Sequence, residues 1–469
     1  MKKVFENFIY NLSYQVFSFV LPIITMPYIT SIISQKMIGI NSLMQANSSY
    51  FILFGMLGIT IYGAREIAKY QSNKEALSNN FFKIYKIQLI SHFICLILYL
   101  VYTYMISYKL LGLFYILNIF ASMFDISWFY IGIEDFKSIA IRNVFVKLIS
   151  FAFLFILVKS DSDIYLYICT LYIPQILINF FMWKKIKKYL YFTRNHIKER
   201  PTRKNVIETV SLFIPQLSSS VYTLLDKTVL GFFVNYTKIA IYDQGQIIIR
   251  LFLAIVPSFS RVMMPRITRS IYAKDNDLTE YYMVNSSNII WFISFGIFFG
   301  VFAIADLFIA WYLPPKYAEV SQIIILSSPI ILAVSGANLI SVQFLIPLGK
   351  EKIYTLSLII ASIMNFILNL IIIPIYGIYG ACISSIISET VGFLIQLVCA
   401  SKYINIRKIF KNIPVFLISG LIMMITLILI KRCFIANFTS LLFLVLIGTI
   451  IYIFCNLTMI IFNRYLHMH

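Results

Sequence analysis

The chain has 469 residues, of which 60% are hydrophobic and only 12% are charged, and its formal net charge is +20. Its mean hydropathy is +0.86, whereas about a quarter of the residues in a soluble globular domain are charged. These values exclude a soluble globular protein and indicate a polytopic membrane protein. The six cysteines are scattered singly through apolar segments, so we expect them to pack rather than to form disulfides or bind metal.

Apolar stretches long enough to cross a bilayer, at roughly 20 residues per crossing, recur about fourteen times. We expect spans centred near residues 20, 53, 93, 120, 150, 173, 219, 251, 295, 333, 362, 388, 421 and 450. The loops between them are short. The predicted fold is all-α: two parallel six-helix bundles around a central cavity, plus two C-terminal helices. The predicted parts are residues 1–190, a basic cytoplasmic linker at 191–204, residues 205–403 and residues 404–469.

The basic residues are distributed unevenly between the two sides of the predicted membrane. If the N-terminus lies inside, only seven of the 39 Lys and Arg residues fall in outer loops: Lys36, Lys109, Lys159, Lys238, Lys316, Lys431 and Arg432. The positive-inside rule therefore predicts that both termini are cytoplasmic. Topology also accounts for most of the net charge, so nucleic-acid binding is not needed to explain it, although basic loops would attract anionic membrane lipids.

Charged residues inside predicted spans are the first functional candidates. A charged side chain at membrane depth costs about 3 kcal/mol or more and usually faces a bundle interior or a wet cavity. Spans seven and eight contain Asp226, Lys227, Asp243 and Arg250. Asp243, Gln246 and Arg250 are spaced i, i+3, i+7 and share one helix face. We interpret this face as a cavity wall; a buried ion pair that only joins helices is the alternative.

Four further ionisable residues lie in or beside predicted spans. Asp125 is near the inner end of span four, Arg142 and Lys147 open span five, and Glu389 is on span twelve. An unpaired carboxylate in lipid favours its protonated form, so Glu389 could carry a proton. Ion pairing of Glu389 with a lysine or arginine inside a span is the competing interpretation.

A weak internal repeat supports two equivalent halves. Residues 38–66 can be laid over residues 239–267 without a gap, which places Gln45 on Gln246 and Arg65 on Arg266. Transporters built from parallel repeats bind their substrate near the membrane midplane, between the halves.

Sequence motifs for enzymes are scarce. No GxxxxGK[ST] loop occurs, so an ATP-driven pump is not expected. The four histidines are too dispersed for a metal site or a catalytic dyad. We therefore expect neither an enzyme nor a bound cofactor.

Four segments together resemble a known family: residues 21–29 (LPIITMPYI), 58–68 (GITIYGAREIA), 128–137 (WFYIGIEDFK) and 374–389 (PIYGIYGACISSIISE). In this order they are similar to bacterial Wzx-type flippases, the O-antigen and capsule repeat-unit transporters of the multidrug/oligosaccharidyl-lipid/polysaccharide exporter superfamily. The similarity covers about residues 1–400.

The resemblance implies a multi-pass protein of the bacterial plasma membrane that moves undecaprenyl-pyrophosphate-linked oligosaccharides from the inner to the outer leaflet by alternating access. A proton or sodium gradient would supply the energy, and the polymerase and other polysaccharide-assembly proteins would be partners. The expected substrate-binding residues are Arg250, Lys227, Lys147, Gln246, Gln45, Arg65 and Arg142, and the expected ion-coupling residues are Asp226, Asp243, Glu389 and Asp125.

Two other functions stay open at this point. A repeat-unit polymerase is also polytopic and works on lipid-linked sugars, but it would be expected to carry a large outer loop. A multidrug exporter shares the superfamily fold, but it transports small cations, and the cations within the spans suit an anionic cargo better.

Overall fold

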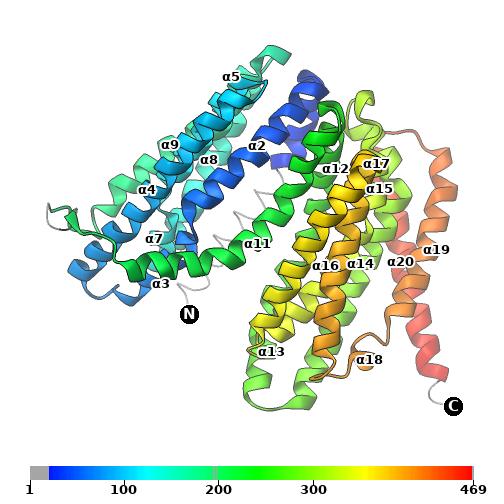
Figure 1. The fold of residues 1–469 in the computed structure, drawn as a ribbon. Helices are drawn as coiled ribbons and strands as arrows, with labels where there is room; N and C mark the ends of the chain where they lie inside the picture. Colours follow the sequence, from blue (N-terminus) through cyan, green and yellow to red (C-terminus); the bar gives the residue numbers. More distant parts are fainter. Residues whose placement is uncertain (1–20, 194–195, 197, 467–469) are drawn as a thin grey trace. The chain divides into compact units, whose positions relative to one another are not determined.

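The structure is a computed structural model that describes residues 21–193, 196 and 198–466 (Figure 1). All regular elements in these residues are helical, which confirms the all-α prediction. Ten of the helices in this part of the chain are long and apolar enough to cross a membrane, or eleven if the bent pair Pro315–Ser327 and Pro329–Leu345 is one span. The chain is therefore a multi-pass membrane protein.

The predicted count of fourteen spans is not confirmed. The first predicted span, centred near residue 20, lies partly outside the described residues. Predicted spans eleven and twelve fall within one 50-residue element, α17 (Glu351–Ala400), where two helices meet at Gly377 with φ 56° and ψ −130°. The helix at the position of the seventh span, α11 (Arg203–Phe233), is not among the ten.

The chain divides into two compact units, residues 1–228 and 229–469. This division falls within α11, whereas the sequence placed the linker at 191–204. The difference arises because the first half of α11 packs on α3 (Ile59–Lys69): Asn205 Nδ2 donates to the Tyr62 hydroxyl at 2.8 Å, and Arg65 pairs with Glu208 at 2.8 Å. The predicted boundaries were drawn from the sequence repeat, whereas the two units are defined by contacts between residues. The predicted boundaries therefore stay a prediction.

The first unit is a helical bundle in which α2 lies against α4 and α8 lies against α9 (Figure 1). The first described helix of this unit is Leu21–Ile32. Its other elements are α2 (Gln35–Met56), α3, α4 (Lys74–Met105), α5 (Lys109–Phe114), α6 (Ile116–Met123), α7 (Ser127–Gly132), α8 (Phe136–Leu157), η1 (Asp161–Asp163), α9 (Ile164–Ile186) and α11 as far as Thr228.

An aromatic cluster forms the core at one end of this unit. The Phe81 ring lies 5.4 Å from the rings of both Trp128 and Phe129. Gly63 allows α3 to approach this cluster, because a Cβ there would lie 2.5 Å from the Trp128 ring. The sequence motifs 58–68 and 128–137 thus meet in one packed region.

The second unit contains the longest helices. Its elements are the rest of α11, α12 (Tyr236–Leu253), α13 (Ile255–Tyr272), α14 (Asn276–Tyr312), η2 (Pro315–Tyr317), α15 (Val320–Ser327), α16 (Pro329–Ile340), the π-helical turn η3 (Ser341–Leu345), α17, α18 (Ile406–Ile409), α19 (Ile413–Ile430), η4 (Lys431–Cys433) and α20 (Phe438–Leu466). Contacts between α14 and α19 and between α19 and α20 join the last two helices to this unit.

The internal repeat is visible in where the helices begin. The Ser34 side chain caps α2 by accepting from Met37 N, and the Asn235 side chain caps α12 by accepting from Lys238 N. The two caps are 201 residues apart, the same shift that lays residues 38–66 over 239–267. Side chains that accept from free N–H groups fix the first turn of a helix, so the repeat sets both starting points.

The cap of α8 predicts a pH-dependent stability. Asp135 accepts from Ser138 N at 3.2 Å and from Lys185 Nζ at 2.8 Å. Burial raises the pKa of this carboxyl, but the hydrogen bonds from Lys185 and Ser138 outweigh burial and leave the pKa below its usual value. The stability that Asp135 contributes is therefore present above the pKa of an unfolded aspartate, about 4, and is lost as the pH falls through the folded pKa.

We expect Asp135→Ala to lower the free energy of unfolding by about 1–2 kcal/mol at pH 7. The difference from the wild type should shrink as the pH falls below about 4, because the wild-type carboxyl becomes protonated when the pH passes its lowered pKa. Thermal unfolding of both proteins in detergent over a series of falling pH values measures this. A difference that stays equally large throughout the series would mean that the charge of Asp135 contributes nothing.

Candidate functional site

A cavity of about 320 Å³ lies within the first unit. Its walls come from Leu21–Ile32, α2, α8 and α9. The lining residues are Leu21, Pro22, Thr25, Ile29, Gln45, Val146, Lys147, Ser150, Phe151, Leu154, Tyr167, Thr170, Leu171 and Tyr172. A cavity of this volume is large enough for a small polar group such as a sugar or a phosphate.

Helix periodicity explains which side chains of α8 reach the cavity. Lys147, Ser150 and Leu154 are spaced i, i+3, i+7 and therefore share one face of the helix. Lys147 is half-buried, with its long aliphatic stem beside apolar neighbours. The helix Leu21–Ile32 is attached to the end of α8 by the Tyr28 hydroxyl, which donates to Val158 O at 2.8 Å, and by the Tyr28 ring, 4.3 Å from Phe155.

The opposite wall carries polar groups from α2 and α9. Gln45 and Tyr172 form a hydrogen bond with each other, and the Tyr172 ring lies 5.7 Å from that of Tyr115. The Tyr115 hydroxyl in turn lies 2.9 Å from Asn41 Oδ1. The cavity thus combines one cation with an amide, hydroxyls and aromatic rings, which are the groups that bind sugars and anions.

The structure brings together two of the predicted substrate-binding residues, Lys147 and Gln45, in this cavity. Tyr167, Thr170, Ser150 and Tyr172 also line the cavity, but they were not among the predicted site residues. A signal for Ser150 was available: it follows Lys147 at i+3, the same spacing as Gln246 after Asp243. The two tyrosines on α9 carried no such signal, because nothing in the sequence places α9 opposite α8.

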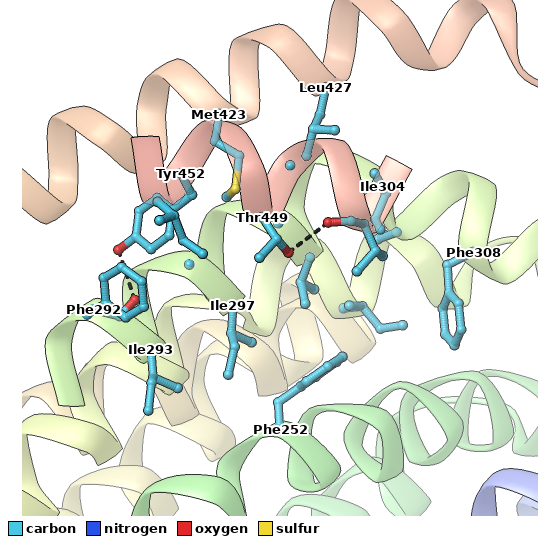
Figure 2. Close-up of a pocket in the computed structure, with 18 of the residues that line it drawn as sticks. Phe252, Phe292, Ile293, Ile297, Ile304, Phe308, Met423, Leu427, Thr449 and Tyr452 are labelled. Atoms are coloured by element: carbon cyan, nitrogen blue, oxygen red, sulfur yellow. Dashed lines mark hydrogen bonds between the residues drawn. The ribbon is translucent and has the colours of Figure 1, made fainter. Parts of the chain in front are cut away.

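A second cavity, of about 470 Å³, lies within the second unit between α12, α14, α15, α19 and α20 (Figure 2). Figure 2 shows Phe252, Ile293 and Ile297 gathered around the same space. Two of its polar groups already have partners: the Tyr452 hydroxyl donates to Phe292 O at 2.8 Å, and the Thr449 hydroxyl donates to Val445 O at 2.7 Å. None of the predicted site residues lines this cavity, and its chemistry suits an apolar chain.

Asp125 and Arg142 were predicted as separate ion-coupling and substrate-binding residues, but the structure places them together. Two parallel hydrogen bonds of 2.8 Å join the guanidinium to the carboxylate. Arg142 is buried, with only 6% of its side chain exposed. Arg65, in contrast, is largely exposed at the end of α3 and pairs with Glu208 at 2.8 Å.

The charged residues of spans seven and eight fall in different surroundings. Asp226 and Lys227 are both buried in α11. Asp243 and Gln246 are buried in α12, and Gln246 Nε2 donates to Ser327 Oγ at 3.1 Å.

The predicted polar face of α12 is therefore divided. Its first two members are packed inside the second unit, whereas Arg250, one turn further along, is exposed. Glu389 is half-buried in α17. Among the described residues, no group of three or more His, Cys, Asp and Glu side chains could hold a metal ion.

Comparisons with known proteins find a matching family and several similar proteins. A family model described as "Polysaccharide biosynthesis protein" matches residues 4–271. A putative O-antigen transporter of Shigella dysenteriae is 24% identical over 388 residues, which is 81% of this chain and 96% of that protein. A second putative O-antigen transporter, from Escherichia coli (strain K12), is 18% identical over 389 residues, 82% of this chain and 93% of that protein.

Solved structures share the fold. The lipid II flippase MurJ in an inward closed conformation superposes with a TM-score of 0.78 at 17% identity, covering 98% of this chain and 99% of that one. An inward-facing multidrug resistance MATE family transporter of the MOP superfamily superposes with a TM-score of 0.60 at 10% identity, covering 84% of this chain and 99% of that one.

Proposed function

Because the chain belongs to the polysaccharide biosynthesis protein family, we propose that it is a flippase for lipid-linked oligosaccharides. The proposed substrate is an undecaprenyl-pyrophosphate-linked repeat unit, which the protein moves from the inner to the outer leaflet of the bacterial plasma membrane. The similarity to putative O-antigen transporters supports this substrate class, and the fold is shared with a lipid II flippase.

The observation that carries the proposal is the cavity of the first unit, with Lys147 in its wall. Sugars and a pyrophosphate cannot cross hydrocarbon unless protein groups replace their water. Lys147 offers a cation that forms charge-assisted hydrogen bonds with a phosphate, while Gln45, Thr25 and Ser150 offer neutral hydrogen-bonding groups for sugar hydroxyls. A wall with this composition is what an amphiphilic anionic cargo requires.

The apolar cavity of the second unit, considered by itself, suits an isoprenoid chain. Its wall is almost entirely aliphatic and aromatic, and the Thr449 and Tyr452 hydroxyls are already bonded to backbone carbonyls. An isoprenoid segment would meet no unsatisfied polar group there. We include this cavity in the proposal as a site for part of the prenyl chain.

The other predicted residues keep their proposed roles. Lys227, Arg250, Gln246 and Arg65 are proposed to contact the anionic or sugar part of the substrate during the transport cycle. Asp226, Asp243 and Glu389 are the carboxylates proposed to couple transport to a proton or sodium gradient. Transport by alternating access would require each state to bind the substrate or ion with a different affinity.

A deletion strain tests the proposed function. Lipid-linked repeat units are counted in right-side-out and inverted membrane vesicles, by their sensitivity to a membrane-impermeant sugar oxidant such as periodate. We expect single repeat units to accumulate on the inner leaflet and surface polysaccharide to disappear.

The same measurement separates the two other functions. Loss of a polymerase would leave single repeat units on the outer leaflet, and loss of a multidrug exporter would leave surface polysaccharide unchanged. Either result would contradict the proposal.

A further inference from the structure

The third candidate span, Lys109–Gly132, contains a break at residues 124–126, between α6 and α7. A break leaves the last carbonyls of α6 without helical partners, and in a membrane such groups must be satisfied by protein or by a wet cavity. Here five consecutive carbonyls, 121 to 125, each accept a side-chain hydrogen bond. The bonds run from Asn179 to Ala121 (2.8 Å), from Gln88 to Ser122 (3.2 Å) and Met123 (3.2 Å), from Trp183 to Phe124 (3.0 Å), and from Gln88 to Asp125 (2.9 Å).

Gln88 is the centre of this arrangement. Its amide nitrogen serves three of the five carbonyls, and its Oε1 accepts from Trp128 Nε1 at 2.9 Å. His92, one turn further along α4, lies 2.8 Å from Gln88 O through Nδ1 and 3.0 Å from Ser122 Oγ through Nε2. Gln88, His92 and Trp128 are all fully buried. The break is therefore held in one geometry by side chains of α4 and α9.

Asp125 lies in the break and contacts α8. Asp125 Oδ1 accepts from Ser127 N at 2.8 Å, at the start of α7, and both carboxylate oxygens accept from Arg142 of α8. The paired hydrogen bonds require the guanidinium and the carboxylate to lie in one plane. This requirement fixes the rotation of α8 about its own axis at Arg142.

Between its two ends, which the Asp135 cap and Tyr28 hold, α8 is little buried within the protein. Only 17% of its apolar segment is buried within the protein, compared with 39–44% for the other four candidate spans of the first unit. Within α8, all of which the structure describes, the buried residues are Ser138, Ala140, Arg142 and Leu154. Lys147 lies five residues after Arg142, so a rotation of α8 at Arg142 would turn the ammonium out of the cavity.

We propose that Gln88, Asp125 and Arg142 are positioning residues for Lys147. In this proposal Gln88 shapes the break, the break presents Asp125, and the Asp125–Arg142 pair keeps the α8 face with Lys147 and Ser150 towards the cavity. The functional consequence rests on the proposed role of Lys147 in binding the substrate, but the positioning itself does not depend on transport.

The test measures the exposure of position 147 directly. The six native cysteines are replaced by serine or alanine, and Lys147→Cys is introduced into the full-length protein in lipid nanodiscs. The rate of its modification by a charged, water-soluble methanethiosulfonate reagent is compared with and without the pair. Gln45→Cys, on α2 in the same cavity, is the matched control.

Removing only Asp125 leaves Arg142 buried without its counterion and risks misfolding. The informative variant is therefore Asp125→Leu with Arg142→Met, which removes both charges. We expect the modification rate at position 147 to fall about tenfold, because a thiol facing lipid reacts poorly, while the rate at position 45 stays unchanged. Exchanging the charges, Asp125→Arg with Arg142→Asp, should restore much of the rate at position 147.

Unchanged reactivity at position 147 in the double variant would overturn the proposal, and so would an equal loss at positions 147 and 45, which would indicate general loosening. The result is also independent of the proposed function. If the rate falls at position 147 while Lys147→Gln still exports polysaccharide, the positioning stands and the substrate-binding role of Lys147 fails.

Discussion

Replacing Lys147 with glutamine is expected to reduce surface polysaccharide about 10–100-fold at unchanged protein level. A hydrogen bond to a charged group contributes about 1.5–3 kcal/mol, and each 1.4 kcal/mol corresponds to tenfold. Glutamine preserves much of the length and the hydrogen-bonding capacity of the side chain but removes its charge. The loss should therefore report the interaction with an anion rather than a change in packing. Surface polysaccharide is measured by immunoblotting of whole cells, and the protein by its amount in isolated membranes.

Two further substitutions make this result specific. Lys147→Arg keeps the cation and should keep most of the export. Lys159→Gln removes a lysine just beyond the end of the same helix, outside the residues that line the cavity, and should leave export unchanged. If Lys147→Gln exports as well as the wild type, or if Lys159→Gln is equally defective, the cavity of the first unit is not where the anionic group binds.

The class of fold and its repeat could be predicted from the sequence because both depend on local patterns. Apolar runs define membrane helices, and helix caps are short-range features, so the repeat alignment agrees with the capping residues Ser34 and Asn235. The number of spans was predicted less accurately than the class of fold. A hydropathy pattern does not reveal how two apolar runs are connected: in α17 the two helices meet directly at Gly377 within one 50-residue element.

The site was only partly predictable, because the partners of a buried charge depend on tertiary packing. The sequence identified Lys147 as a charge beside an apolar span and Gln45 by its alignment with Gln246, but only tertiary packing brings α2, α8 and α9 around one cavity. The Asp125–Arg142 pair depends on a helix break at Phe124, Asp125 and Ile126, which contains neither proline nor glycine. Without these residues no local signal marks the break, and so the two charges looked like separate functional candidates.

The prediction for Arg250 shows the limit of helix periodicity. Asp243, Gln246 and Arg250 do share a face of α12, as their spacing requires, but a common face does not mean common surroundings. Gln246 reaches Ser327 at the end of α15, whereas Arg250 lies one turn beyond that contact and is exposed. A periodic pattern can place residues in line along a helix, but it cannot say where the neighbouring helix ends.

Replacing Gly58 with alanine is expected to be among the most destabilising single substitutions in the first unit. Gly58 has φ +78° at the junction of α2 and α3, a conformation that costs an L-residue about 1–2 kcal/mol. A Cβ at this position would also lie 2.8 Å from Phe213 N and 2.9 Å from Thr209 O, both in the backbone of α11. Backbone atoms cannot rotate away as a side chain can, so overpacking should add about 1–3 kcal/mol.

Gly349→Ala separates the two causes. Gly349 has φ +72°, almost the same backbone conformation, but nothing lies within 4 Å of the position of its missing Cβ. Its substitution should therefore cost only the conformational part, so thermal unfolding in detergent should show a clearly smaller fall in Tm than for Gly58→Ala. Equal falls in Tm would mean that α11 does not pack against the α2–α3 junction. A larger fall for Gly58→Ala would indicate that this contact, on which the grouping of the first half of α11 with the first unit depends, exists in the folded protein.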